Sequence, residues 1–545
     1  MEDRLTHRAP STAPDATPVS DPAPPPGPER ALVFVGFMGA GKSTAARRVA
    51  ATRKGGREPQ DSDDILERRL GHSIAREFAD HGEARFRERE EQVVLELLDR
   101  AGSADVIALG GGSLQSEPVR NALKAHCVVY LEVDADTAWR RATDAQDTTD
   151  RPLARDRDRF DALHAARRSV YEDVADAILP PHDQSPPAGA VSVLEAFATG
   201  PGDLSLLWAT TASGDYSVLI GPGALAGAPW PLSPSSRRFC VTDEHVETHH
   251  LGRLSDLAGA VVIAPGETHK TLHTAERVWR ALAAQGVSRS DHLVALGGGV
   301  VGDLAGFCAA TYQRGIPVVQ VPTTLVGQVD SAYGGKTGVD LPEAKNYVGA
   351  YHQPAGVIVD TATLHTLPAA ELAAGWAEVI KTALIAGGGL WARVESGAGL
   401  DERMIRDCAR TKLAVVGADE RDVGARQVLN LGHTVGHAIE TATAYARYRH
   451  GEAVGLGLLA ALRLSGAEDL RDRVAAMLAK HGLPTRLEGT DAQTVLAATA
   501  RDKKRTPDGV PYVLLEAPGK PRPGCAVAQA DVLAAVVELT TAKTI

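Results

Sequence analysis

Short apolar runs separated by turn residues recur along the chain and predict buried strands. Residues 31–36, ALVFVG, lead through a Gly-rich turn into the helical pattern AARRVAATR. Similar runs occur at 105–109 (DVIAL), 216–223 (YSVLIGPG) and 292–296 (HLVAL). Unbroken apolar runs of this length are typical of strands covered on both faces by helices. The pattern therefore predicts an α/β fold class.

Two later segments have the pattern of helices and carry polar side chains on one face. GWAEVIKTALI, 375–385, places Glu378 and Lys381 three residues apart. NLGHTVGHAIE, 430–440, places His433 and His437 one turn apart, about 6 Å along the axis. Two imidazoles aimed at one point, with His450 beyond the helix, can hold a divalent metal. A HxxxH pair alone is more often a surface or core feature, so both interpretations stay open.

Two Pro-rich stretches divide the pattern into modules. Residues 1–30 contain PAPPPGP and few large apolar side chains, which predicts a disordered tail. From 179 to 204 the chain contains LPPHDQSPPAGAV and ATGPGD with a short apolar stretch, VSVLEAF, between them, which predicts a linker around the end of the first module's last helix. The boundary between two modules is expected near residue 200.

Composition limits the possible functions. The chain has 545 residues, enough for two to four domains, with 44% hydrophobic and 23% charged residues. Its net charge of -11 argues against a nucleic-acid-binding surface and is compatible with local sites for small anions. No apolar run is long enough to span a bilayer, and the first thirty residues lack a signal-peptide core, so we expect a cytoplasmic protein. The five cysteines are scattered and predict buried, reduced thiols.

The first Gly-rich turn carries a phosphate-binding motif. GFMGAGKST, 36–44, is GxxxxGK[ST] between a strand and a helix, as the motif requires. Its glycines, including Gly39 and Gly41, let backbone N–H groups surround phosphates. Lys42 is expected to reach the β and γ phosphates, and the hydroxyl of Ser43 to bind Mg²⁺. ATP with Mg²⁺ is the predicted cofactor.

Later segments of this module supply groups for a phosphoryl acceptor. DSDD, 61–64, offers one carboxylate for Mg²⁺ and another for a substrate hydroxyl. GEARFRERE, 82–90, supplies arginines, and LGGGS, 109–113, permits close backbone approach to a ligand. RPLARD, 151–156, follows a polar stretch expected to form a lid, and Arg151 is expected to close over the phosphoryl group.

These pieces, in this order over about 150 residues, resemble the shikimate kinase family. The resemblance implies a P-loop kinase domain at 31–180. It implies that Lys42 and Arg151 stabilise the transition state, that Asp63 is catalytic, and that Ser43 and Asp61 bind the metal. Nucleotide contacts are implied for Gly39, Gly41, Lys42, Ser43, Thr44 and Arg141. Shikimate contacts are implied for Asp63, Arg87, Gly110, Gly111, Gly112 and Arg167. RPLA replaces the family's RPLL, and the segment before it is a few residues long, which puts turnover rate in doubt.

The second module has its own nucleotide-binding motif. GGGVVGDLAGF, 297–307, follows the apolar strand at 292–296, so its backbone amides are expected to contact a pyrophosphate. A tight packing turn is the alternative for this motif alone. VTDE at 241–244, APGETHK at 264–270 and VPTTL at 321–325 add acceptors and hydroxyls that a nicotinamide dinucleotide needs.

Cationic side chains then gather in an otherwise acidic chain. YQRG, QVDSAYGGKTG, EAKN and RDKK contribute arginines and lysines, which predict a substrate with a phosphate and a carboxylate. Glu378 with two of the histidines would form a site with an open position, as catalytic zinc requires. An exposed ion pair is the alternative for Glu378 and Lys381.

This module resembles the 3-dehydroquinate synthase family across residues 215 to 540, on GGGVVGD, QVPTTL, GGKTG, AEVIK, NLGHTVGHA and HGEAV. The resemblance implies an NAD-binding α/β domain at 205–370 after the linker at 181–204, and a helical metal-binding domain at 371–545. Its implied reaction converts 3-deoxy-arabino-heptulosonate 7-phosphate into 3-dehydroquinate and phosphate, with NAD and zinc, or Co²⁺, as cofactors. A homodimer through this module and small-molecule substrates are also expected.

The family's residues carry over by motif. The resemblance implies metal ligands Glu378, His433 and His450, which moves His437 to the substrate. Catalytic roles are implied for Asp330, Lys381, Arg426 and His437. NAD and nearby contacts are implied for Asp243, Glu267, Lys270, Gly298, Gly299, Val300, Val301, Gly302, Asp303, Thr323, Thr324, Lys336, Lys345, Thr363 and Thr366. Substrate contacts are implied for Arg314, Lys336, Lys345, Asn346, Lys412, Asn430 and Lys503.

Three positions depart from the family and leave alternatives open. Asp422 stands where Glu is usual, Asp340 where Asn is common, and Tyr333 is bulkier than the usual aliphatic residue. Another sugar-phosphate cyclase activity is therefore the alternative for the second module. For the first module the alternative is a non-catalytic sensor of shikimate or nucleotide.

Overall fold

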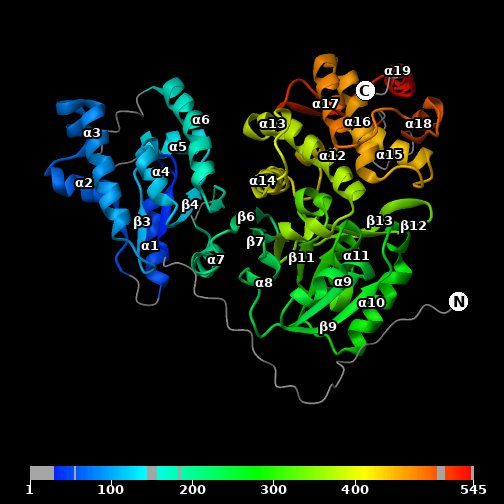
Figure 1. The fold of residues 1–545 in the computed structure, drawn as a ribbon, viewed down its shortest axis with the longest axis horizontal. Coiled ribbons are helices and arrows are strands. Elements are labelled where there is room, and N and C mark those ends of the chain that lie inside the picture. The colour runs from blue at the N-terminus through cyan, green and yellow to red at the C-terminus, as the bar shows by residue number, and fades with distance from the viewer. Residues whose placement is uncertain (1–29, 54–56, 144–155, 182–185, 500–509, 542–545) are drawn as a thin grey trace.

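A 12-stranded sheet forms the centre of the computed structural model, which describes residues 30–53, 57–143, 156–181, 186–499 and 510–541 (Figure 1). The strand order is β2-β3-β1-β4-β5-β6-β7-β14-β11-β10-β8-β9. Neighbouring strands are parallel, except that β6 and β7 are antiparallel. The predicted α/β fold class is confirmed. The predicted disordered tail lies outside the described residues, apart from Arg30.

The first module holds five of these strands with helices around them. The strands are β1 (Leu32–Val35), β2 (Gln60–Asp61), β3 (Val106–Ala108), β4 (Cys127–Leu131) and β5 (Ala177–Leu179). The helices are α1 (Lys42–Thr52), α2 (Ser62–Leu70), α3 (Ile74–Asp99), α4 (Glu117–Leu123), α5 (Ala135–Thr143) and α6 (Arg157–Val174). Strand β1 is fully buried and leads directly into the Gly-rich turn before α1, as predicted.

The stretch predicted as a linker contains a packed helix. Helix α7 (Ala188–Thr199) buries Ala190, Val191, Leu194 and Phe197 against the main hydrophobic core. These positions share one helical face. VSVLEAF therefore has the apolar spacing of an amphipathic helix, and it forms one despite the Pro and Gly on either side. Strand β6 (Ser205–Thr211) follows, and it pairs with β5 of the first module. Most of 186–211 is therefore regular structure, and α7 occupies much of the segment at 181–204 that was expected to be a linker around the end of the first module's last helix.

The nucleotide-binding half of the second module forms the rest of the sheet. Its strands are β7 (Gly214–Gly221), β8 (Arg238–Asp243), β9 (Leu257–Ile263), β10 (His292–Gly297), β11 (Val318–Pro322) and β14 (Gly356–Asp360). Its helices are α8 (Ala224–Gly227), α9 (Glu244–His250), α10 (Leu272–Ala284) and α11 (Gly299–Thr311). A separate hairpin joins β12 (Lys336–Leu341) to β13 (Ala344–Tyr351).

The C-terminal part is mainly helical. It comprises α12 (Ala369–Ala386), α13 (Gly388–Glu395), α14 (Glu402–Ala418), α15 (His433–Ala442), α16 (His450–Leu464), α17 (Glu468–Lys480), α18 (Ala492–Thr499) and α19 (Gln529–Thr541), with a hairpin of β15 (Tyr512–Leu515) and β16 (Pro521–Cys525). Both helices predicted from the sequence, around 375–385 and 430–440, are present. Helix α12 is buried from Ala374 to Ile385, so Glu378 and Lys381 within this stretch must find partners inside the protein.

Two further observations concern the whole chain. No helix in the described ranges has the length and apolar character needed to cross a membrane. The cysteines are free thiols, and all but the half-buried Cys525 are buried, as predicted.

Two candidate active sites

The Gly-rich turn of the first module has the backbone conformation that a phosphate site requires. Gly39 and Gly41 have positive φ angles of 81° and 87°, which side chains other than glycine rarely adopt. Helix α1 begins at Lys42 and has no side-chain cap, so the amides of its first turn, with Ser43 and Thr44, remain directed at a ligand. Lys42 Nζ donates to the carbonyl of Phe37 at 3.2 Å, and Arg141 donates to the carbonyl of Gly39 at 3.1 Å.

Two carboxylates of the first module lie at the end of β2, beside this turn. Asp61 caps α2 and accepts the backbone N–H of Asp63 at 3.0 Å. Burial and the charge of Asp61 raise the pKa of Asp63 to about 7, against the opposing effect of Lys42. The two side chains therefore occupy different environments. This agrees with the prediction that Asp61 binds the metal and Asp63 faces the substrate hydroxyl.

The glycine triplet makes room for charged side chains around a second binding position. A Cβ at Gly110 would lie 2.5 Å from Oδ1 of Asp63, and one at Gly112 would overlap the guanidinium of Arg87. The carbonyl of Gly111 accepts hydrogen bonds from Arg167 at 3.0 Å and from Tyr171 at 2.6 Å. The structure thus brings together residues from four segments predicted to contact the acceptor. Arg151, predicted to close over them, lies outside the described residues.

The second module contains a cavity of about 1440 Å³ between its nucleotide-binding half and its helices. Most residues predicted for NAD and substrate line it: Asp243, Glu267, Lys270, Gly298, Gly299, Val300, Asp303, Thr323, Thr324, Asp330, Lys336, Lys345, Asn346, Thr366, Lys412, Arg426, His433, His437 and His450. One cavity therefore collects residues that are scattered over more than two hundred positions of the sequence.

Other predicted residues of this module lie elsewhere. Val301 and Thr363 are buried, with Val301 in the core beneath Gly297. Gly302 packs against Gln320, and Asn430 donates to the carbonyl of Gln427 at 3.1 Å. Arg314 is exposed and does not line the cavity. The contacts predicted for these side chains stay predictions, and Lys503 lies outside the described residues.

The nucleotide side of the cavity is built from strand ends and the start of α11. A Cβ at Gly298 would lie 2.8 Å from the methyl of Thr324, so the close approach of these two segments requires glycine. Lys270 is buried and bonds to Asp303 at 2.9 Å, while Asp243 caps α9. A helix N-terminus next to hydroxyls and carboxylates fits a dinucleotide with its pyrophosphate at α11.

A network of buried and half-buried charges forms the floor of the helical side. Lys381 bonds to Asp330 at 2.9 Å and to Glu378 at 2.5 Å, and Lys412 also pairs with Asp330. Burial opposes ionisation of Asp330, yet the two lysines hold its pKa well below the ordinary value. Burial lowers the pKa of Lys412 despite Asp330. Arg426 is buried and donates to the carbonyls of Glu420 and Gly334 at 2.6 and 3.0 Å.

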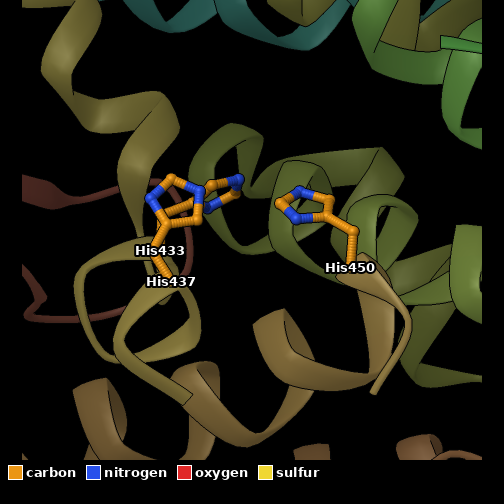
Figure 2. Close-up of side chains that lie close together, drawn as sticks. All are labelled: His433, His437 and His450. Carbon is orange, nitrogen blue, oxygen red and sulfur yellow. The ribbon is translucent and has the colours of Figure 1, made fainter. Parts of the chain in front are cut away.

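Three histidines converge above this floor (Figure 2). His433, at the start of α15, His437, one turn on, and His450, at the start of α16, offer ring nitrogens within 4.8 Å of one another. Buried Oε1 of Glu378 lies 3.6 Å from Nε2 of His433 and 3.4 Å from Nε2 of His450, and it accepts no hydrogen bond from the described residues. A buried acceptor without a donor, facing two imidazole nitrogens, fits a metal ligand set of Glu and two His.

The second ring nitrogens are held by other groups. Nδ1 of His433 lies 3.2 Å from the carbonyl of Leu431, and Nδ1 of His450 lies 3.3 Å from Glu440. These contacts leave Nε2 of each ring for a metal. Glu440 is buried and also bonds to Lys345 at 3.2 Å, and the sequence prediction missed it. Its spacing from His433 and His437 on one helical face was the available signal.

Two features define the class of the chain: a P-loop phosphotransferase domain, and a dinucleotide-binding domain that shares a charged, metal-binding cavity with helices. Family models for shikimate kinase match residues 38–198, and those for the N-terminal and C-terminal domains of 3-dehydroquinate synthase match 260–374 and 375–505. The chain belongs to the 3-dehydroquinate synthase family and carries a shikimate kinase domain at its N-terminal side. The predicted fusion and both enzymatic classes are confirmed.

Individual relatives agree with this assignment. The chain is 42% identical over 337 residues to 3-dehydroquinate synthase of Nitrobacter hamburgensis, covering 56% of this chain and 88% of that protein. A 2-epi-5-epi-valiolone synthase from Streptomyces hygroscopicus with NAD⁺ and Zn²⁺ bound has a TM-score of 0.55 at 29% identity, over 60% of this chain and 97% of its own. A 2-deoxy-scyllo-inosose synthase with carbaglucose-6-phosphate, NAD⁺ and Co²⁺ has a TM-score of 0.54 at 25% identity, over 61% and 99%.

Proposed function

We propose that the chain phosphorylates shikimate with MgATP at the first site and cyclises 3-deoxy-arabino-heptulosonate 7-phosphate to 3-dehydroquinate at the second. The observation that carries the proposal is the pairing of each family match with an assembled site: a phosphate-binding turn beside Asp63, and a cation-rich cavity beside Glu378 and His433. The two substrates are small anions, which suits the lysines and arginines of both sites.

In the kinase site, the amides of α1 and Lys42 hold the nucleotide phosphates. Ser43 and Asp61 are positioned for Mg²⁺, and Asp63 for the shikimate hydroxyl that attacks the γ-phosphate. Arg87 and Arg167 approach the glycine triplet from different helices and hold the shikimate carboxylate. Charge placement, rather than covalent chemistry, supplies the rate enhancement.

In the synthase site, cations surround the substrate position from several elements. Lys412 lines the cavity and exchanges part of its interaction with Asp330 for the anionic substrate, while the buried Lys381 holds Asp330 from behind and Arg426 supports the same wall. The imidazole of His437, within the histidine cluster, is positioned to accept or return a proton from the substrate. The buried position of this network excludes water and keeps the charges preorganised.

The residues fit both absent cofactors. Glu378, His433 and His450 would hold Zn²⁺ or Co²⁺, and the residues around Gly298 and Asp303 would hold NAD. When bound, NAD supplies a hydride acceptor for a substrate alcohol, and the metal supplies a Lewis acid at the alcohol oxygen. The side chains of the cavity orient the substrate between NAD and the metal.

A different sugar-phosphate cyclisation is the second candidate, because the two structural neighbours are such cyclases. The three residues that depart from the family pattern, Tyr333, Asp422 and Asp340, bear on the choice between these two reactions. The ring of Tyr333 is buried and its hydroxyl donates to the carbonyl of Gln328 at 2.7 Å, so it adds no polar group to the substrate. Asp422 pairs with Lys336 at 2.5 Å, and Asp340 accepts the backbone N–H of Asn346 at 2.7 Å. Each carboxylate is thus held by a contact within the protein and is not directed at the substrate by that contact, which favours 3-dehydroquinate synthase.

Purified full-length chain tests the two activities in parallel. Shikimate with MgATP should yield a phosphorylated product, and the heptulosonate phosphate with NAD and zinc should yield 3-dehydroquinate and phosphate. Heptulose and hexose phosphates form the comparison panel. Turnover of one of these in preference to the heptulosonate phosphate would replace the synthase assignment, and absence of phosphorylated shikimate would leave the sensor as the function of the first module.

The assembly and the location of the chain are part of the proposal. A homodimer through the synthase module, acting in the cytoplasm where ATP and NAD are available, follows from the family assignment. Sedimentation of the full chain at several concentrations measures the oligomeric state. Fractionation of cells, with an antibody to the chain, measures its location.

A further inference from the structure

The kinase module and the synthase module are joined by more than chain connectivity. Strand β5 of the kinase module pairs with β6, with Ala177 opposite Leu206, so the sheet continues from one module into the other. Next to this seam, α14 of the helical part faces the kinase module (Figure 1). The arginines of α14 that contact the kinase module lie three and four residues apart, on one face of the helix.

One of these arginines forms a half-buried ionic contact, here called the anchor, with two glutamates of the kinase module. Arg410 donates one guanidinium nitrogen to Glu132, which follows β4, and another to Glu172 of α6, at 2.8 Å. All three side chains are at most 22% exposed, and the carboxylates raise the pKa of Arg410 despite burial. Bridging two carboxylates with a planar guanidinium fixes direction as well as distance, which lysine does not do.

The other contacts have a different character. Arg406 is buried and donates to the carbonyls of Ala175 and Glu172, both at 3.3 Å. Arg403 pairs with Asp173 at the rim, where both side chains are more than a third exposed. Exposed pairs contribute little, so Arg403 provides a matched control on the same helix.

The opposite face of α14 reaches the synthase site. Lys412 lies two residues after Arg410, so its side chain leaves the helix on the other side, where it lines the cavity and pairs with Asp330. The anchor and the active-site lysine are thus held by one rigid element.

We propose that the kinase module positions the synthase site: the contact of Arg410 with Glu132 and Glu172 fixes α14 and thereby sets Lys412 against Asp330 and the substrate. Arg410 is a positioning residue, and its partners belong to a module whose described residues contribute no side chain to the synthase cavity. The proposal rests on the assignment of Lys412 to the substrate of the synthase reaction.

The test changes only the kinase side of the anchor. Glu132→Gln with Glu172→Gln, in the full chain with zinc and NAD, should raise the KM for the heptulosonate phosphate at least about threefold and leave the KM for shikimate within about twofold. Arg403→Gln should leave both unchanged within about twofold. A purely structural defect would lower the yield of active enzyme and kcat instead, so the split between KM and kcat separates the two.

Two further variants separate the positioning role of Arg410 from the role of Lys412. Arg410→Lys retains the charge but not the bridge, and it should reproduce the rise in KM if the double variant fails to fold. Lys412→Ala should raise the same KM by more than either. An unchanged KM in the anchor variants, beside a raised KM in Lys412→Ala, overturns the positioning role alone. An unchanged KM in Lys412→Ala overturns the assignment of Lys412 and the positioning role together.

Discussion

The two active sites hold their charged groups in different ways. In the synthase site Lys381 and Glu378 are buried, Asp330 is half-buried, and Lys381 already pairs with both carboxylates, so the cost of removing these charges from water is met during folding. In the kinase site the phosphate position is made by backbone amides, and charged side chains approach a glycine triplet from separate helices. We infer that the synthase site depends on a few central side chains, whereas the kinase site distributes its binding over many groups.

Removing a metal-facing histidine should have the largest effect, because the synthase site depends on it. His433→Ala deletes one ring of the cluster, and loss of the Lewis acid should reduce cyclisation more than about a thousandfold. Bound zinc, measured by elemental analysis after dialysis, should fall in parallel. His273→Ala, an exposed histidine of the same module, is the control.

Phosphorylation of shikimate by His433→Ala should be unchanged. This result would show that the kinase site works independently of the metal site. Retention of both zinc and cyclisation would instead show that His433 is dispensable, and the remaining histidines would have to be the ligands.

Removing the P-loop lysine should have the next largest effect, on the other site only. Lys42→Ala deletes a charge directed at the nucleotide phosphates and should lower shikimate phosphorylation about 100-fold to 1000-fold. Cyclisation measured on the same preparation should remain at the level of the unaltered chain. Lys124→Ala, an exposed lysine of the same module, is the control.

If Lys42→Ala lost both activities while its melting temperature was retained, the sites would be coupled through the nucleotide. Unchanged phosphorylation would contradict the assignment of the Gly-rich turn.

A smaller effect is expected from the carboxylate behind the metal site. Glu440 faces Nδ1 of His450 and so orients the ring. Glu440→Gln should weaken zinc binding about 10-fold to 100-fold, measured by competition with a chelating dye, which requires no turnover. Glu488→Gln changes an exposed glutamate of the same domain and should leave the zinc affinity unaltered. Equal affinities in the two variants would remove Glu440 from the metal site.

The sequence predicted the chemistry of both sites because that chemistry is local. The P-loop, the glycine triplet and the HxxxH spacing each lie within a few residues, and all three are where the prediction placed them. It placed the end of the first module's last helix within 179–204 but not the bounds of α7, because the Pro and Gly around VSVLEAF indicated a linker. Arg410 was not identified from the sequence, because its partner Glu132 is 278 residues away in the chain. Long-range ion pairs of this kind leave no spacing signal, and Asp330 with Lys412 is a second example.

The smallest effect should come from filling the glycine triplet, and it tests whether the kinase site is held by many modest contacts. An added Cβ at Gly112 would overlap the guanidinium of Arg87 and displace it from the shikimate position. Loss of one charged hydrogen bond should raise the KM for shikimate roughly tenfold in Gly112→Ala, with kcat little changed, in steady-state assays. Arg87→Ala should give a similar KM, and Gly112→Ala added to Arg87→Ala should raise it no further, because both changes remove the same contact. A much larger, additive loss of kcat would mean that the triplet serves the reacting groups directly, and the kinase site would then resemble the synthase site in its dependence on a few positions.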